Sequence, residues 1–134
     1  MENYSISEQF NKWNHQKQRI HFNGKMPLFS ENEIWWCGVG ENVGVEINGK
    51  NKRFSRPVFI YRKLNKYSFL GIPMTTKEKK GSWYVKVSLH SKTSTAVLSQ
   101  IRIISSSRLY ERMGELDEHD SERIRKAFCT LYTK

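Results

Sequence analysis

Apolar and polar residues follow the period of a helix in the first part of the chain. Over residues 6–20 the large apolar side chains recur at intervals of three, four and seven positions, so they fall mostly on one face. Ser5 and Glu8 open this stretch with the spacing of a capping box. The pattern predicts an amphipathic N-terminal helix over residues 6–20, and we expect its apolar face to pack on the body of the domain.

Residues 33–104 have a different texture, with short apolar runs separated by turn-forming segments. The runs are EIWWCGV, RPVFIYRK, YSFLGIPM, WYVKVSL and TAVLSQIRII. Five short strands with no long helical segment between them predict a small antiparallel β-barrel. Pro57 has no N–H to donate to a strand ladder, so we expect it at the first residue of its strand or on an edge.

The C-terminal part predicts a second helix. The preceding segment SSSRLYERMG is interpreted as a turn or a short helix, and either Asp117 or Asp120 can cap the helix that follows. The apolar stripe of this helix has the spacing i, i+3, i+4, i+7 and consists of Ile124, Ala127, Phe128 and Leu131. The expected fold is therefore mainly β with helices.

Length and charge narrow the possible partners. A chain of 134 residues is most simply one compact domain with a sizeable core. Its net charge of +10 is concentrated: residues 50–92 hold twelve Lys and Arg against Glu78 as the only acidic residue. A scattered excess would only solubilise the protein, whereas a concentrated one indicates a polyanionic partner, most commonly nucleic acid.

Several classes of protein are disfavoured by what the sequence lacks. The start MENYSISEQF has neither the basic nor the apolar region of a signal peptide, and no apolar run approaches membrane-spanning length. Cys37 and Cys129 do not have metal-ligand spacing. These features predict a cytoplasmic protein that does not enter a membrane and whose two thiols are free.

Metal and cofactor chemistry find little support in the sequence. The histidines have no helical or strand spacing to a second ligand, and no Ser–His or Cys–His pairing is evident; they are His15, His21, His90 and His119. The glycine pattern GVGENVG is not followed by a helical pattern, so it does not predict a phosphate-binding loop. We expect neither a metal nor a cofactor.

A few polar residues at strand ends remain as candidates for chemistry. Arg56 precedes Pro57, which biases it towards an extended backbone, and its planar guanidinium suits a phosphate. Thr75 and Thr76 end an apolar strand just before the basic loop KEKKG, within reach of a phosphodiester bound there. Each residue also has an ordinary interpretation: Arg56 in a surface salt bridge, the threonines as strand residues, and Glu46 as a solvated carboxylate.

The order of these motifs resembles the MazF/PemK family of toxins from bacterial type II toxin–antitoxin systems. The resemblance rests on SENEIWWCGVG, GVE, SRPVFI, IPMTT and LSQIRIISSSRL, followed by the closing helix. It implies a small SH3-like barrel with a C-terminal helix over residues 31–134, preceded by a helical extension over residues 1–30 that lies outside the shared pattern.

The resemblance also implies an activity. Members of the family are homodimeric, metal-independent, sequence-selective endoribonucleases that cleave single-stranded RNA to 2′,3′-cyclic phosphate and 5′-hydroxyl ends. Each is held by a cognate acidic antitoxin.

The positions that match the family's motifs then have expected roles. Arg56 and Thr75 match its catalytic arginine and threonine, and Glu46 matches a glutamate that some members use as a base. Gln100 matches a residue near the same groove. The residues that we expect to bind substrate are Thr76, Lys77, Lys79, Lys80, Gln100 and Arg53.

Two other functions fit the same residues. One is a non-catalytic RNA- or DNA-binding barrel, in which the basic segment and the aromatic residues Trp83, Tyr84 and Tyr67 form a stacking platform. The other is a toxin of the same fold that poisons gyrase by protein binding. The basic charge concentrated beside Arg56 favours RNA.

Overall fold

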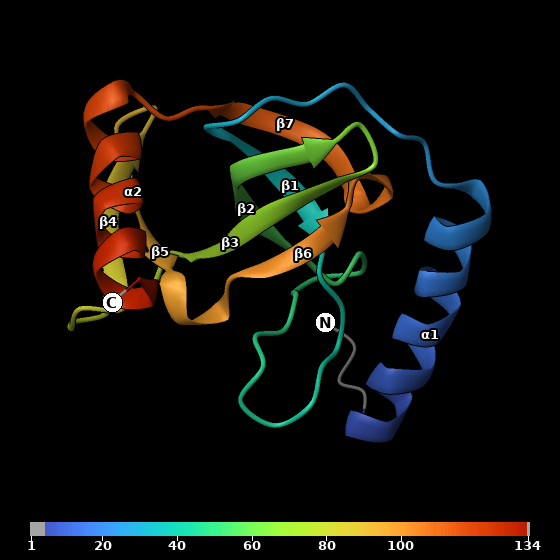
Figure 1. Ribbon diagram of the computed structural model, residues 1–134. Coiled ribbons are helices and arrows are strands. Elements are labelled where there is room, and N and C mark those ends of the chain that lie inside the picture. Colours follow the sequence, from blue (N-terminus) through green and yellow to red (C-terminus); the bar gives the residue numbers. More distant parts are fainter. Residues whose placement is uncertain (1–4, 134) are drawn as a thin grey trace.

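A computed structural model describes residues 5–133; residues 1–4 of the predicted extension and residue 134 lie outside the described part. Figure 1 shows a strongly curled sheet with one helix on each side of it. The elements in chain order are α1 (Ile6–Asn23), β1 (Glu33–Gly38), β2 (Ser55–Asn65), β3 (Ser68–Thr75), β4 (Tyr84–Leu89), β5 (Lys92–Val97), η1 (Leu98–Gln100), β6 (Arg102–Ser105), η2 (Ser106–Arg108), β7 (Leu109–Glu115) and α2 (Glu118–Tyr132).

The predicted N-terminal helix is present and extends three residues beyond residue 20. Its cap is the expected one, because the Ser5 hydroxyl accepts a hydrogen bond of 3.2 Å from the Glu8 N–H. It packs on the body through one buried side chain, Trp13, whose ring lies 5.6 Å from that of Phe54. Gly40 lets this ring approach, since a Cβ built there would lie 2.3 Å from it.

The sheet runs in the order β4-β5-β3-β2-β1-β7, with β6 also paired to β3, and its strand pairs are antiparallel. The central strand β2 is buried on both faces. Because successive side chains point to opposite faces of a strand, Phe59 and Tyr61 enter one apolar cluster while Val58 and Ile60 enter another. This double burial explains why the sequence of β2 shows a continuous apolar run rather than alternation.

The predicted single strand over residues 95–104 is wrong, because the chain forms two strands there. Met74 pairs with Ala96 and Gly71 pairs with Arg102, so three steps along β3 correspond to six on the facing segment. The three-residue turn η1 takes up the difference and inserts Leu98, which is fully buried, into the core. Tertiary packing thus divides a run that is continuous in the sequence.

The segment 105–114 also differs from its prediction as a turn or short helix. Only residues 106–108 form a short helical turn, η2; Ser105 still belongs to β6, and residues 109–114 belong to the strand β7. β7 pairs with the outer edge of β1, where Trp36 lies opposite Glu111. Most of its side chains are exposed, so β7 is stabilised by its backbone hydrogen bonds to β1 rather than by burial of apolar side chains. A hydrophobic pattern cannot reveal such bonds.

The expected closed barrel is not found, because the ladder of residues 5–133 ends at β4 on one side and at β7 on the other. Side-chain contacts span this seam instead of a backbone ladder. His90, in the turn after β4, donates from Nε2 to the Met113 carbonyl of β7 at 3.0 Å. Asp120 of α2 accepts from the Ser88 N–H at 3.0 Å, so the C-terminal helix covers β4.

The C-terminal helix agrees with its prediction. Asp117 is the N-cap, and its carboxylate accepts from the Asp120 N–H at 2.8 Å. The predicted stripe faces the core: Ile124 is fully buried, and Ala127, Phe128 and Leu131 pack around the same cluster. In the part of the chain that the structure describes, neither helix has the length and apolar character needed to cross a membrane.

Candidate functional site

The site forms where β2 and β3 separate. The two strands pair as far as Val58 and Pro73, and two more steps of the same register would place Arg56 opposite Thr75. At that point β3 changes partner, since Thr75 pairs with Thr95 of β5 instead. The Arg56 side chain spans the resulting gap and donates from Nη1 to the main-chain carbonyl of residue 74 at 3.3 Å.

Pro57 lies at this separation, as the third residue of β2. It is therefore not at the first residue of its strand, and β2 is a central strand rather than an edge. It is tolerated because it pairs only with Trp36 of β1, while the ladder to β3 begins one residue later at Val58. The proline thus stands beside the unpaired stretch and fixes the backbone next to Arg56.

Arg56 is a half-buried cation whose hydrogen-bond partners are neutral. Its Nε donates to the Asn48 carbonyl at 2.9 Å, and Nη1 reaches the carbonyl of Met74. Burial lowers the pKa of Arg56, because desolvation disfavours the charged form. Among residues 5–133 the ion pairs are Arg62–Glu31, Arg112–Glu33 and Arg123–Asp120, so no carboxylate balances Arg56. An anion bound here would meet an uncompensated guanidinium.

Thr75 directly follows Met74, whose carbonyl accepts from the Arg56 guanidinium. The residue is only 7% exposed, and its Oγ1 accepts a hydrogen bond of 3.2 Å from the Lys77 N–H. Because a hydroxyl accepts and donates at once, this bond leaves the Thr75 hydrogen available for a ligand. The chain then becomes exposed, and the predicted substrate-binding residues of this segment follow: Thr76, Lys77, Lys79 and Lys80.

Gln100 fixes the loop that joins β1 to β2. Its Oε1 accepts from the Ile47 N–H and its Nε2 donates to the Val45 carbonyl, both at 3.1 Å. The same loop is held one residue further on by the bond from Arg56 to Asn48. Gln100, predicted to lie near the groove, therefore holds the loop backbone beside Arg56.

Glu46 lies on this fixed loop, but its carboxylate is bonded to the backbone of the loop rather than to Arg56. It is exposed and accepts a hydrogen bond of 3.0 Å from the Val43 N–H, closing its own turn. The structure thus brings Arg56, Thr75 and Gln100 to one place and leaves the Glu46 carboxylate on the rim. A rotation of its side chain is needed before it can meet a ligand of Arg56.

Arg53 lies in a separate contact with β7. Its guanidinium carbon is 4.3 Å from the centre of the Tyr110 ring, and the Tyr110 hydroxyl donates to Ser55 Oγ at 2.8 Å. Ser55 is buried and directly precedes Arg56. Arg53 is therefore linked to Arg56 through the backbone that leads into β2. It is not part of the basic segment that follows Thr75.

Asn48, whose carbonyl binds Arg56, is a residue that the sequence did not single out. Its side chain accepts from the Asn42 N–H at 2.6 Å, and the Asn42 amide donates to the carbonyls of Val39 and Ile47. The next residue, Gly49, must be glycine here, since a Cβ would lie 1.8 Å from a backbone oxygen. The Asn-Gly pair at 48–49 is the sequence signal that could have drawn attention to this position.

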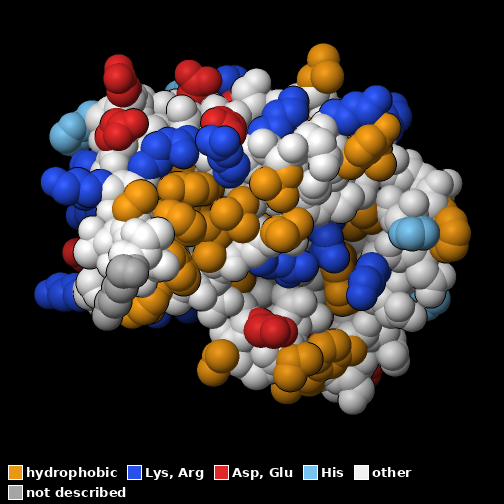
Figure 2. Space-filling view, viewed as in Figure 1, with side chains coloured by type: hydrophobic (Ala, Val, Ile, Leu, Met, Phe, Trp, Pro, Cys, Tyr) orange, Lys and Arg blue, Asp and Glu red, His pale blue; other side chains and the backbone are white. Residues whose placement is uncertain are grey.

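The charge of this region is visible on the surface. Figure 2 shows Lys and Arg side chains gathered between the β1–β2 loop and the strands above it, with apolar side chains at the tip of the loop. The most exposed of these apolar residues are Val43 and Val45. Positive charge is therefore gathered beside a projecting loop on this face of the molecule.

Cysteine and metal chemistry receive no support from the described residues. Cys37 is fully buried, and burial raises its pKa to about 12, so its thiol is protonated at neutral pH. Cys129 is exposed and free. Residues 5–133 contain no group of three or more His, Cys, Asp or Glu placed to hold a metal ion.

Comparison with protein families places this arrangement in context. The sequence model described as "PemK-like, MazF-like toxin of type II toxin-antitoxin system" matches residues 30–132. The chain belongs to this family. The match begins after α1, so the N-terminal helix of this MazF-like chain is not part of the family pattern. No curated protein sequence matches the chain significantly.

Solved structures share the fold of this MazF-like chain at low sequence identity. MazF from Deinococcus radiodurans has a TM-score of 0.63 and 20% identity over 78% of this chain and 96% of that one. An endoribonuclease in complex with its cognate antitoxin, from a Mycobacterial species, has a TM-score of 0.61 and 14% identity over 77% and 93%. The MazE–MazF complex of Deinococcus radiodurans has a TM-score of 0.60 and 14% identity over 80% and 97%. At these identities the likeness establishes the fold.

Proposed function

We propose that this chain acts as the toxin of its type II system by cleaving single-stranded RNA as a sequence-selective, metal-independent endoribonuclease. The observation that carries the proposal is the half-buried Arg56 guanidinium, which is bonded only to carbonyls, one of them that of Met74, the residue directly before Thr75. Family membership supports the toxin role.

The proposed reaction is an in-line transfer within the RNA. The ribose 2′-oxygen attacks the adjacent phosphorus, the bond to the 5′-oxygen breaks, and the products end in a 2′,3′-cyclic phosphate and a 5′-hydroxyl. Negative charge grows on the non-bridging oxygens, where the fixed fork of Arg56 and the hydroxyl of Thr75 stabilise it most. Neither group has to move, because both are held by their neighbours.

Glu46 is the proposed base for the 2′-hydroxyl. Its carboxylate exchanges the Val43 N–H for the substrate hydroxyl and takes its proton, while the 5′-oxygen, hydrogen-bonded by Arg56, takes one from solvent. Gln100 supports this step by holding the backbone on both sides of Glu46. The exposed segment after Thr75 supplies positive charge to the RNA backbone, through Thr76, Lys77, Lys79 and Lys80, and Arg53 adds to it from the loop.

The proposed assembly is a cytoplasmic homodimer inhibited by an acidic antitoxin. Residues 50–92 carry eleven more positive than negative charges, which an acidic segment would complement. Two of the structures that share this fold are complexes with an antitoxin. An antitoxin that folds on binding can cover such a surface with a short segment.

The test is cleavage of a mixed-sequence RNA in EDTA by the purified protein, with the ends of the products mapped. We expect fragments with 5′-hydroxyl and 2′,3′-cyclic phosphate ends, cut at a recurring sequence. Arg56→Ala is the control, and we expect its rate to fall by about 10²–10³. Uncut RNA that is nevertheless bound would indicate a non-catalytic binding protein. An Arg56→Ala variant that cuts at the wild-type rate would refute the assignment of the site.

A further inference from the structure

α1 turns a polar stripe towards the β1–β2 loop. Gln9, Lys12, Gln16 and Arg19 follow one another at intervals of three, four and three residues, so they lie on one face of the helix. Trp13, on the adjacent face, anchors the helix against Phe54 of the loop. This helix precedes the part of the chain that the family pattern covers, so the stripe is a feature that this chain adds to the fold.

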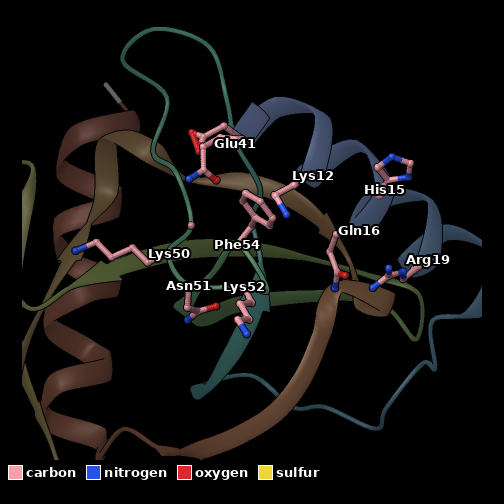
Figure 3. A pocket seen from close by; sticks show the side chains of 11 residues that line it. Lys12, His15, Gln16, Arg19, Glu41, Lys50, Asn51, Lys52 and Phe54 are labelled. Atoms are coloured by element: carbon pink, nitrogen blue, oxygen red, sulfur yellow. The ribbon is translucent and has the colours of Figure 1, made fainter. Parts of the chain in front are cut away.

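A cleft of about 970 Å³ separates this stripe from the loop. Figure 3 shows the helix residues on one side and the loop residues on the other, with Glu41 at the opposite end from Arg19 and Lys52. Four Lys and Arg side chains line the cleft against one carboxylate. The lining residues are Gln9, Lys12, His15, Gln16, Arg19, Glu41, Gly49, Lys50, Asn51, Lys52 and Phe54.

The backbone of the β1–β2 loop links the cleft to the Arg56 site. Asn48, whose carbonyl accepts from Arg56, is followed directly by Gly49, the first residue of this loop segment to line the cleft. Lys50 then pairs with Ser55, the residue before Arg56. The residues that line the cleft thus begin one position along the loop from the residue whose carbonyl binds Arg56.

We propose that this cleft is an RNA subsite, in which α1 and the loop together bind phosphates of nucleotides that flank the cleaved bond. The proposal rests on the proposed function and extends it to a part of the chain outside the family pattern. The Lys and Arg side chains of the cleft are complementary in charge to the phosphates of RNA. The amides of Gln9, Gln16 and Asn51 both donate and accept, which suits base edges and ribose hydroxyls better than the carboxylates of an acidic peptide.

Binding to RNA that cannot be cleaved tests the subsite separately from catalysis. Fluorescence anisotropy would compare 2′-fluoro oligonucleotides of about 4 and about 12 nucleotides, which lack the attacking hydroxyl. We expect Arg19→Gln and Lys52→Gln each to weaken binding of the long oligonucleotide about fourfold at about 0.15 M salt. Each should lower the slope of log affinity against log salt by about 0.7, the value for one phosphate contact to a single strand. The short oligonucleotide should bind these variants and the wild type alike.

Lys17→Gln is the matched control, because it removes the same charge from the same helix at a position that does not line the cleft. Thermal unfolding of each variant checks that α1 stays folded. The proposal is overturned if Lys17→Gln loses as much affinity as Arg19→Gln, or if the variants bind the long oligonucleotide as the wild type does. It is also overturned if they lose affinity for a polyglutamate peptide and not for RNA. A wild type that binds with this length dependence but cleaves no RNA would refute only the proposed function.

Discussion

The bonds from Gln100 to the loop predict how firmly Glu46 is positioned. Gln100→Ala removes the acceptor of the Ile47 N–H and the donor to the Val45 carbonyl, both of which are partly exposed. At about 1 kcal/mol for each bond, the loop should lose about 2 kcal/mol of local stability. A loss of that size corresponds to a roughly thirtyfold larger fraction of molecules in which the loop is open, while the stability of the core of the domain is unchanged.

Two measurements check this prediction. Amide hydrogen exchange should show the protection of the Ile47 N–H falling by about thirtyfold, with strand amides unchanged. On cleavage, kcat/KM should fall by up to the same factor. Ser99→Ala is the control, because Ser99 is an exposed neighbour in the same short turn. If Ile47 keeps its protection in Gln100→Ala, the loop is held by something else and the reasoning fails.

Three further predictions concern single substitutions at Arg56, Thr75 and Glu33. Arg56→Lys should restore little of the activity lost in Arg56→Ala, measured as kcat/KM, because an ammonium cannot reach both Asn48 and a phosphate as a planar fork does. Thr75→Ala should lower kcat and leave the affinity for uncleavable RNA nearly unchanged, whereas equal losses in both would place the hydroxyl in ground-state binding. Glu33→Gln should lower the free energy of unfolding by about 1.5–3 kcal/mol at neutral pH, with the exposed Glu115→Gln as control.

The pH dependence of that last effect follows from the environment of Glu33. Burial by itself would raise the pKa of Glu33, but hydrogen bonds from the Trp35 indole, the Arg112 guanidinium and the Ser30 N–H outweigh it and lower the pKa. A lowered pKa means that the carboxylate stabilises the fold above the pKa of the unfolded chain, about 4.3. Urea unfolding should therefore show the difference between wild type and Glu33→Gln shrinking as pH falls below that value. A difference that is constant with pH would contradict the argument.

Local patterns in the sequence were sufficient where a side chain acts on its own neighbourhood. The caps Ser5 and Asp117 satisfy N–H groups three residues away, so their spacing predicts them. Arg56 and Thr75 were singled out because each stands at the end of an apolar run, where strand ends meet at the edge of a sheet; their roles stay predictions. That their backbone positions come near each other follows from extending the β2–β3 register two steps beyond Val58 and Pro73.

The parts that were missed depend on partners far away in the chain. β7 is mostly polar, and it is a strand because β1 has a second edge to pair. The turn at Leu98 exists because β3 has two successive partners. The carboxylate of Glu46 accepts from the Val43 N–H, a backbone donor of its own loop. Periodicity carries none of this information, since each case is decided by which hydrogen-bonding group is free after folding.

The opening of the sheet and the candidate site have one cause. β3 leaves β2 after Pro73 and pairs with β5 through Met74 and Thr75, and the same step frees the space that the Arg56 side chain fills. Were β2 and β3 paired to their ends, the guanidinium would lie on a continuous strand face instead of filling a gap between the strands. The separation of the strands therefore supplies the half-buried position of the cation, which the Met74 carbonyl of β3 and the Asn48 carbonyl of the β1–β2 loop then hold. Substitutions that restore pairing beyond Val58 should stabilise the sheet and remove the site together.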